Sequence, residues 1–489
     1  MSTSASLQGR VVGPLDRRRR VTRCLSCAKR RTKVWDVTLH FMRSVQLIFS
    51  SVKGVSHVLV AYDRTRSALL RSNRDKQDDF GGAHRSSAQK SMIVKNNHSS
   101  GHHPLNFIGK DKGIRLLDYF VSFIEQNMFT TGFSSIVPDL LPLISTSPLL
   151  YYAVIAVGAL DAHRHTGGRA LQGENSPYVD AMTSYHKSIG ILRICVEHEH
   201  VMQREDVLWA TFFLGLFELL SDDSGEGWVK HMLYGTSKML QLAGPSDCMS
   251  SPRRIFYDLF RILEASRALL FGEGTILSQE CWLQLQKTLS SNATRWEPLE
   301  EIITLMIQTS AFSLQAGAIV DNIPEEERFQ DPSLAMIGAE GLNVQESIYH
   351  WHTTMLLQMG QDGPSEYSNL ALLYYHALLI FLSGNYDYFP YWDNIPAPVL
   401  SPAEISEHLS SILYLSGEVL RHSKIPGVML FFPVTVAGAR ARKVDQQSKI
   451  LNLLDLVFSK GFVVASKIRG DLLERWGERN REERMHIPA

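Results

Sequence analysis

The sequence predicts an all-α protein: a body of many antiparallel helices in layers, preceded by a basic N-terminal arm that is mostly disordered. Three observations lead to this prediction. From about residue 111 onward, apolar residues recur at intervals of three and four, which is the spacing of one helix face. The alternation of apolar and polar residues that is typical of strands is rare. With 44% hydrophobic and 20% charged residues, most of the chain has the composition of an ordinary globular protein.

The composition divides the 489 residues into three predicted parts. Residues 1–76 form the basic arm, residues 77–110 are rich in Ser, Gly, His and Asn and are typical of a linker, and residues 111–489 form the helical body. The formal net charge is zero, but residues 1–103 hold 20 Lys and Arg against 6 Asp and no Glu. Residues 104–489 have an equal excess of Asp and Glu over Lys and Arg. This asymmetry favours a polyanionic partner for the arm, with a solvated tail as the alternative.

The first helices of the body can be placed by the period of their apolar residues. The opening helix presents one apolar face, which consists of Leu117, Phe120, Val121 and Ile124. Pro148 begins a second helix that is apolar on nearly all sides, so we expect it to be central. A third helix follows Ser176, an N-cap residue, and Pro177, which suits the first helical position.

Later helices follow the same pattern. One is predicted over 205–220 and another over 228–242, ending at Gly244 and Pro245. Further helices are predicted near these positions: 253–270, 298–318, 342–360, 366–383, 403–421 and 446–475. Glu218 lies in an otherwise apolar helix, and we expect a basic partner for it because an unpaired buried acid is costly.

Several classes of protein are excluded by what the sequence lacks. The five cysteines are too few and too irregular for a disulfide scaffold. The apolar runs are too short or too interrupted to span a bilayer, so no membrane partner is expected. No metalloprotease, phosphate-loop or nucleophile-elbow motif occurs in its proper context. The acidic run 222–226 resembles a terpene cyclase motif only superficially, and an acidic loop is expected there. We therefore predict that the protein is not an enzyme.

The most informative feature is the pair Cys24 and Cys27 at the start of CLSCAKRRTK, residues 24–33. Two thiolates at this spacing can chelate one zinc ion, because a short turn points both sulfurs inward. Nine cations surround the pair: Arg17, Arg18, Arg19, Arg20, Arg23, Lys29, Arg30, Arg31 and Lys33. Their charge favours the thiolate form and suits DNA phosphates. A redox pair and a chance pair in a basic tail are the alternatives.

The segment RCLSCAKRRTK resembles the opening of the fungal zinc binuclear cluster, the Zn(2)-C6 type, whose pattern is C-x2-C-x6-C, a loop, then C-x2-C-x6–9-C. In that family a basic helix of the type R-x-R-R-x-K lies between the second and third cysteines, and residues 28–33 here read AKRRTK. The resemblance implies that Lys29, Arg30, Arg31 and Lys33 contact DNA in the major groove. It also implies that Cys24 and Cys27 are zinc ligands of an incomplete set.

The chain departs from this family at the third cysteine, where it has Val34, and no further cysteine follows before the linker. Two thiolates cannot hold the two zinc ions that the family holds with six. Such a small metal domain folds on the free energy of metal binding. We therefore expect residues 1–76 to be largely disordered in this chain.

Residues 34–61 are β-branched and apolar, and their composition differs from that of both flanks. If residues 34–61 are removed, the sequence reads CLSCAKRRTK-YDRTR. This resembles the family's C-x2-C-x6-C-D-x-x-R, with Tyr62 in place of the third cysteine. One hypothesis is an unspliced intron or a gene-model error, and the other is true decay of the module. The transcript sequence separates them, because a spliced message that restores cysteines supports the first.

The body, from about residue 113 to 290, resembles the fungus-specific transcription factor domain that follows such clusters. The resemblance depends on landmarks in a fixed order, at residues 116–120, 147–159, 185–192, 209–218 and 227–235. The last one reads Gly227-Trp228-x-x-His231-x-x-x-Gly235. Trp228 and Gly235 lie two turns apart, which favours close helix packing, and His231 is interpreted as a core or cap histidine.

These resemblances imply a nuclear, zinc-dependent DNA-binding transcription factor that regulates RNA polymerase II genes. Its expected partners are double-stranded DNA, a second copy of the chain, and a coregulator or small effector. Zinc is expected from the family alone. The alternative is a helical regulator that does not bind DNA and acts through partner proteins or a small effector. Zinc content and the salt dependence of DNA binding distinguish the two.

Overall fold

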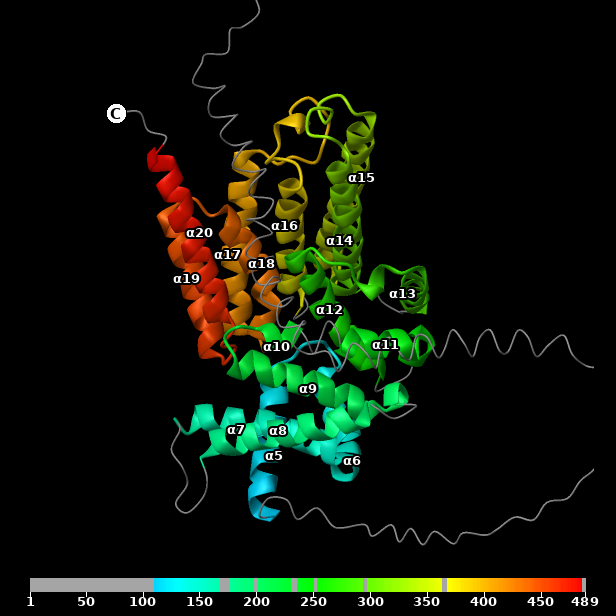
Figure 1. Cartoon of the computed structure of the whole chain (residues 1–489), viewed down its shortest axis with the longest axis vertical. Helices are drawn as coiled ribbons and strands as arrows, with labels where there is room; N and C mark the ends of the chain where they lie inside the picture. Colours follow the sequence, from blue (N-terminus) through cyan, green and yellow to red (C-terminus); the bar gives the residue numbers. More distant parts are fainter. Residues whose placement is uncertain are drawn as a thin grey trace, which may run out of the picture. The chain divides into compact units, whose positions relative to one another are not determined.

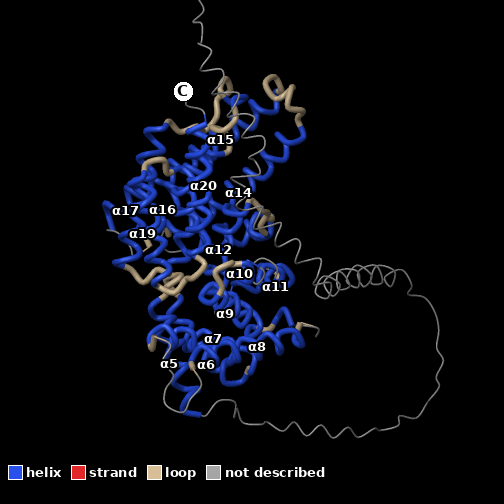
Figure 2. The backbone as a smooth tube through the Cα atoms, turned by 60° about the vertical axis from the view of Figure 1, so that its left-hand side comes forward, coloured by secondary structure: helices blue, strands red, loops and turns tan. Residues whose placement is uncertain are grey.

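The computed structural model describes residues 110–489, apart from seven short segments: 168–175, 197–200, 230–234, 250–252, 293–296, 363–366 and 486–489. The described residues form sixteen α-helices, numbered α5 to α20, joined by loops and 3-10 turns. Figure 2 shows these residues as helices and loops without a strand. The prediction of an all-α body is therefore confirmed. Residues 1–109 of the predicted arm and linker lie outside the described residues, so the predicted domain boundaries stay a prediction.

Five helices come first in the body: α5 Lys110–Gln126, α6 Ile136–Thr146, α7 Pro148–His165, α8 Pro177–Cys195 and α9 Glu205–Ser221. Helix α7 packs against α6, α8 and α9, and Figure 1 shows α7 and α8 side by side. Most residues of α7 and α9 are buried. The prediction that the apolar run after Pro148 is central is therefore confirmed.

Helix α7 begins at the predicted proline. Ser147 is its N-cap, and Ser147 Oγ accepts a hydrogen bond from the Leu150 N–H at 3.3 Å. The same hydroxyl donates to Asp206 Oδ2 at 2.6 Å. Pro148 occupies the first helical position, where a missing N–H costs no hydrogen bond. Ser147 therefore joins the first turn of α7 to the first turn of α9.

Small residues line the buried side of α8. Ala181, Ser184 and Ser188 are buried there, and Ser188 Oγ donates to the Leu149 carbonyl of α7 at 2.9 Å. Side chains of this size let the two helix backbones lie close together. Ser176 is the N-cap of α8, as predicted, although its hydroxyl makes no cap hydrogen bond.

The middle of the body contains four helices: α10 Glu226–Val229, α11 Ser237–Ala243, α12 Arg253–Phe271 and α13 Glu280–Asn292. Helix α11 ends directly before Gly244, as predicted. Residues 230–234 are outside the described part, so the predicted helix 228–242 is seen only at its two ends. Phe256 of α12 packs edge to face against Trp209 of α9, with ring centroids 5.0 Å apart. This contact joins α12 to the first group of helices.

Seven helices complete the chain: α14 Pro298–Asn322, α15 Pro332–Asp362, α16 Ser368–Gly384, α17 Pro402–His422, α18 Phe431–Arg440, α19 Val444–Ser459 and α20 Ala465–Met485. Helix α16 packs against α14, α15, α17 and α18, and Figure 1 shows it between them. Most of its residues are buried, so α16 is the core helix of this group.

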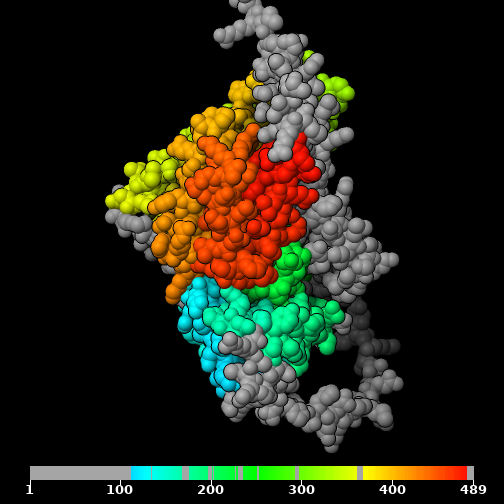
Figure 3. All heavy atoms as spheres, turned by 90° about the vertical axis from the view of Figure 1, so that its left-hand side faces the viewer, coloured from blue at the N-terminus to red at the C-terminus, as the bar shows by residue number. Residues whose placement is uncertain are grey.

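Helices α17, α19 and α20 lie along one side of the body, where Figure 3 shows their surfaces in orange and red. Helix α19 packs against both α17 and α20. Trp476 of α20 donates its indole N–H to the Gly438 carbonyl of α18 at 2.9 Å. The indole is buried, so this bond fixes the charged C-terminal helix to the core.

Some predicted bounds are wrong. Helix α15 begins ten residues before the predicted position 342. The single helix predicted over 446–475 is two helices, because Gly461 adopts a φ of 102° and interrupts the helical turn between α19 and α20. Helices α6, α13 and α18 were not predicted. Pro142 lies inside α6, where a proline is normally interpreted as a break.

Helix α14 is the one helix in the described part of the chain that is long and apolar enough to cross a membrane. More than half of its most apolar window is buried against the rest of the protein. Its buried residues, such as Ile302, Met306 and Phe312, belong to the core between α12 and α16. The composition of α14 is therefore that of a core helix.

Two arginines of α12 are buried together with acidic partners. Arg267, which is 4% exposed, binds Glu264 at 2.8 and 3.0 Å and Glu273 at 2.9 Å. Its Nη2 also donates to the Gly274 carbonyl at 3.0 Å. Arg261 is paired with Glu300 of α14. Buried guanidinium groups are tolerated only with such partners, so these pairs fix α12 in the core.

Candidate functional site

The residues predicted to bind zinc or DNA lie between positions 17 and 33, outside the described residues. The roles of Cys24 and Cys27 as zinc ligands, and of the nine surrounding cations in DNA contact, therefore stay predictions. The same holds for His231, which lies in an undescribed segment of the body.

The donor set of this chain does not fit the two-zinc cluster that the resemblance implies. Such a cluster needs six thiolates, and the arm offers Cys24 and Cys27 with Val34 at the third position. The other cysteines lie in the helical body: Cys195, Cys248 and Cys281. Within the described residues, no group of three or more His, Cys, Asp or Glu side chains could hold a metal ion. We therefore assign zinc no role in the function proposed for this chain.

Three landmarks of the body converge at one place. Tyr185 of α8 donates its hydroxyl hydrogen to Glu218 Oε1 of α9, although the two residues lie 33 positions apart. Gly227 of α10 lies against the same carboxylate, because a Cβ on Gly227 would overlap Glu218 Oε2. The sequence placed these residues in three separate landmarks. The structure shows that they form one contact between α8, α9 and α10.

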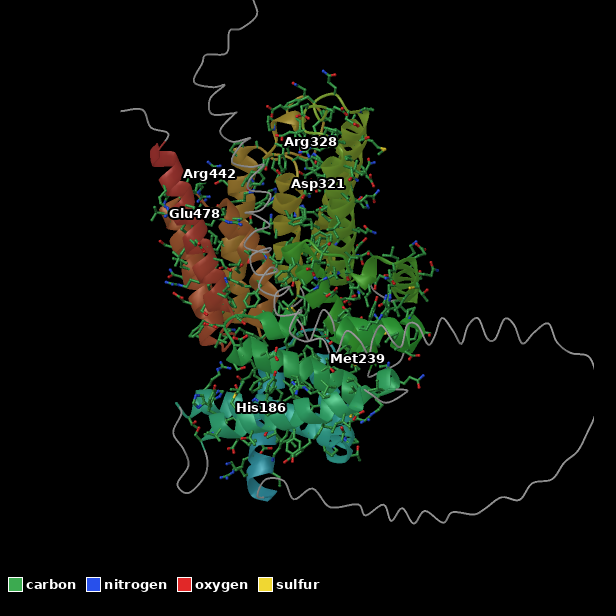
Figure 4. The ribbon with its side chains drawn as sticks, in the orientation of Figure 1. His186, Met239, Asp321, Arg328, Arg442 and Glu478 are labelled. Atoms are coloured by element: carbon green, nitrogen blue, oxygen red, sulfur yellow. The ribbon has the colours of Figure 1, made fainter. Side chains whose placement is uncertain are left out.

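The chemistry of this contact is structural. Glu218 is 8% exposed, and Tyr185 stacks on Phe217 with ring centroids 4.5 Å apart. Burial, together with the nearby Glu218 carboxylate, raises the pKa of Tyr185, so the phenol keeps its proton at neutral pH. The donor at Glu218 Oε1 is this neutral hydroxyl. The basic partner expected for Glu218 from the sequence stays a prediction. Figure 4 labels His186, the residue that follows Tyr185 on α8.

The acidic run 222–226 forms the turn between α9 and α10. Asp222 accepts hydrogen bonds from the Ser224 hydroxyl and from the Ser224 N–H, the latter at 3.2 Å. Asp223 is exposed. Since Asp222 serves its own turn, the run has the role predicted for it, that of an acidic loop.

We expect Tyr185→Phe to lower the free energy of unfolding by about 1–3 kcal/mol, because the buried Glu218 carboxylate loses a hydrogen-bond donor. Urea unfolding followed by circular dichroism measures this change. Tyr414→Phe is the matched control, because Tyr414 is 67% exposed. An equal effect of the two substitutions would show that the hydrogen bond to Glu218 contributes nothing.

A second cluster of polar groups lies where α15, α16 and α17 meet. His376 Nδ1 of α16 is 2.8 Å from His408 Nδ1 of α17, so one imidazole donates and the other accepts. Tyr375 is next to this pair and stacks on His352 of α15, with ring centroids 4.1 Å apart and planes at 9°. Three helices therefore contribute one histidine each to the surroundings of Tyr375.

Burial controls the charge of these histidines. Desolvation, with the neighbouring His408 and His352, lowers the pKa of His376 to about 3. Desolvation also lowers the pKa of His408 and that of His352. All three rings are therefore neutral at pH 7, and two protons on the facing nitrogens would break the pair. The sequence analysis missed this cluster, because its members look like isolated histidines on separate helices.

Neither cluster resembles a catalytic centre. In the first, a protonated phenol holds a buried carboxylate, and in the second, neutral imidazoles hold two helices together. Both join helices that are distant in the sequence. The arrangement therefore suits a rigid helical scaffold that presents surfaces.

Comparison with known proteins supports the resemblance of the body. Residues 115–486, more than half of the chain, match a family described as the fungal specific transcription factor domain. An uncharacterized protein of Emericella nidulans is 21% identical over 145 residues, which is 30% of this chain and 31% of that relative. The aligned part of the chain thus spans less than a third of that relative's length. No solved structure matches this chain. The family match does not reach Cys24 and Cys27, so the resemblance to a zinc cluster stays a prediction.

Proposed function

This chain belongs to the fungal specific transcription factor domain family, and from this premise we propose that it is a nuclear, DNA-binding regulator of RNA polymerase II genes. The family match over 115–486 is the observation that carries the proposal. It supports a regulatory role for the helical body within a transcription factor. In a transcription factor, DNA is the partner that we propose for the basic arm.

The arm supplies the charge that DNA binding needs. Residues 17–33 contain nine Lys and Arg and no Asp or Glu. A protein that neutralises phosphates with such side chains releases counterions, so its affinity falls steeply as salt rises. In this proposal the segment contacts the phosphate backbone, and Lys29, Arg30 and Arg31 lie nearest to the bases.

The body is proposed to bind regulatory partners: a second copy of the chain, a coregulator or a small effector. The described helices support this role because buried contacts such as Arg267–Glu264 and Tyr185–Glu218 hold them in one arrangement. A rigid scaffold presents its surface residues in a fixed geometry, which recognition requires. Zinc has no step in this proposal, since two thiolates do not complete the cluster.

Fluorescence anisotropy with duplex DNA tests the proposal on the full chain. We expect the logarithm of the binding constant to fall linearly with the logarithm of the salt concentration. Replacing Lys29, Arg30, Arg31 and Lys33 by Gln should weaken binding and reduce the slope by about 3 to 4, since each phosphate contact contributes about 0.9. The control variant removes four exposed cations of the body: Lys187, Lys287, Arg442 and Lys449.

The control variant should retain the affinity and the slope of the unmodified chain. Binding that is absent, or that is equally reduced in both variants, contradicts a DNA contact through residues 17–33. The alternative function, a helical regulator that binds proteins or a small effector, would then replace it. The departure at Val34 is the observation that favours this alternative.

A further inference from the structure

The charge of the body is concentrated in one stretch. Residues 298–420 contain 16 Asp and Glu but a single Lys or Arg, which is Arg328. Figure 4 shows Arg328 at the loop that joins α14 to α15. Its guanidinium donates to the Ile323 carbonyl at 3.0 Å and lies over the Tyr391 ring. The helices α15 and α16, and α17 as far as Leu420, therefore contain no cationic Lys or Arg of their own.

One face formed by these helices is apolar in part and acidic in part. Tyr349, His352 and Leu356 recur at the i, i+3, i+7 spacing and so lie on one side of α15. Leu356 is 54% exposed, and Tyr349 and His352 are partly exposed. The described residues thus leave this side of α15 partly exposed. We define the α15–α17 face as Glu346, Tyr349, His352 and Leu356 of α15 with Glu404 and Glu407 of α17.

The carboxylates of the α15–α17 face lie near its aromatic residues. Burial, with Glu404 and Glu346 nearby, raises the pKa of Tyr349. Glu407 similarly contributes to the raised pKa of Tyr375, which stacks on His352. Ring contacts join the two helices at the same place, because Tyr375 stacks on His352 of α15 and its ring centroid lies 6.1 Å from that of His408 of α17. The face is therefore continuous across the two helices.

The three acids of the face are exposed and have no ion pair within the described part of the chain. The histidines beside them do not neutralise them, because burial keeps those rings uncharged at pH 7. Uncompensated charge of one sign attracts a polycation and opposes a second surface of the same sign. Two copies of this face would therefore repel each other.

We propose that residues 17–33 of the same chain bind the α15–α17 face when DNA is absent. The inference rests on the proposed function, since it assigns a second, competing partner to the segment that contacts DNA. Nine cations and no acid complement a face with three unpaired acids and no cation. An arginine plane can stack on Tyr349, and the apolar stems of Lys and Arg can cover Leu356.

Chain length allows this contact. The segment ends at Lys33, and 76 residues separate it from the first residue of α5, Lys110. At ~3.3 Å per residue, a chain of that length can span up to roughly 250 Å. The binding of residues 17–33 to the face would lower the apparent affinity for DNA, because only the released fraction of the arm can bind phosphates.

Carbodiimide coupling on the full chain tests the proposal, since this reagent joins a lysine amine directly to a carboxylate that it touches. We expect amide links from Lys29 and Lys33 to Glu346, Glu404 and Glu407, identified by peptide mass spectrometry at low salt. Replacing the three acids by Gln removes these coupling sites, and the lost links from the two lysines should not be replaced by links to other acids of the body. Gln at position 404 can still serve the capping box with Ser401, so α17 keeps its first turn.

The control variant replaces Glu325, Glu326 and Glu327 by Gln. It removes the same charge from the exposed loop between α14 and α15, and the yield should not change. Links spread over many acids of the body, or a yield that the face variant does not lower, would overturn the proposal. Links found only between isotopically light and heavy chains would overturn it too, because they show the arm of another copy.

Duplex DNA separates this proposal from the proposed function. DNA that binds the chain should reduce the links to the face, as competition requires. If DNA binds through residues 17–33 and the links remain, the proposal that DNA and the α15–α17 face compete for this segment is wrong. A chain that forms the links but binds no DNA refutes the DNA-binding function and still supports the docking of the arm.

Discussion

Arg267→Met is expected to lower the free energy of unfolding by about 3–5 kcal/mol, which would be the largest effect of any single substitution considered for this body. Glu264 is 1% exposed and receives two hydrogen bonds from the Arg267 guanidinium. Without them, an uncompensated carboxylate remains in the core. Equilibrium unfolding in urea, followed by far-ultraviolet circular dichroism, measures the loss.

A double variant tests whether the loss comes from the unpaired charge. Glu264→Leu combined with Arg267→Met removes both charges and should cost less than Arg267→Met alone, since apolar residues of similar volume can replace a buried pair. Lys449→Met is the control, because its partner Asp445 and Lys449 itself are both exposed. We expect a change of about 0–1 kcal/mol there. A double variant less stable than Arg267→Met would contradict this account.

Acidification is expected to remove the stabilisation that comes from the His376–His408 contact. The pKa of His376 falls from an ordinary value near 6.5 to about 3 in the folded protein. Below pH 6.5 the unfolded chain therefore takes up a proton that the folded chain excludes, and the folded state loses stability as pH falls towards 3. At about 1.4 kcal/mol per pH unit, the loss reaches about 3 kcal/mol by pH 4.

The measurement is the difference in unfolding free energy between the unmodified chain and His376→Gln at pH 7 and pH 4. The difference is needed because Asp258, whose pKa is raised to about 6, takes up a proton in the folded state and works in the opposite direction. Other groups that face His376 and His408 are His352 and Tyr375, with two acids of α17, Glu404 and Glu407. All of them are retained in the variant.

We expect the advantage of the unmodified chain over His376→Gln to shrink by about 3 kcal/mol between pH 7 and pH 4. His186→Gln is the control, because His186 is exposed on α8 and lies outside the His376–His408 pair. A difference for His376→Gln that changes no more between pH 7 and pH 4 than the difference for His186→Gln would show that the His376 ring is protonated freely in the folded state.

Several features of this protein were determined by the sequence alone. The spacing of apolar residues predicted an all-α body and placed most of its helices, because one buried helix face needs apolar residues at that spacing. Local signals also placed particular ends: Pro148 at the start of α7, Ser176 before α8 and Gly244 after α11. The order of landmarks in the body indicated the family that the later match showed.

Other features were decided only by the tertiary structure. The hydrogen bond from Tyr185 to Glu218 and the contact of His376 with His408 join residues 33 and 32 positions apart. Neither pair can be inferred from a helical period, since the period says which face is buried and not which helix covers it. Helix α6, which contains Pro142, was missed for a related reason. Its tertiary packing outweighs a local sequence that normally ends a helix.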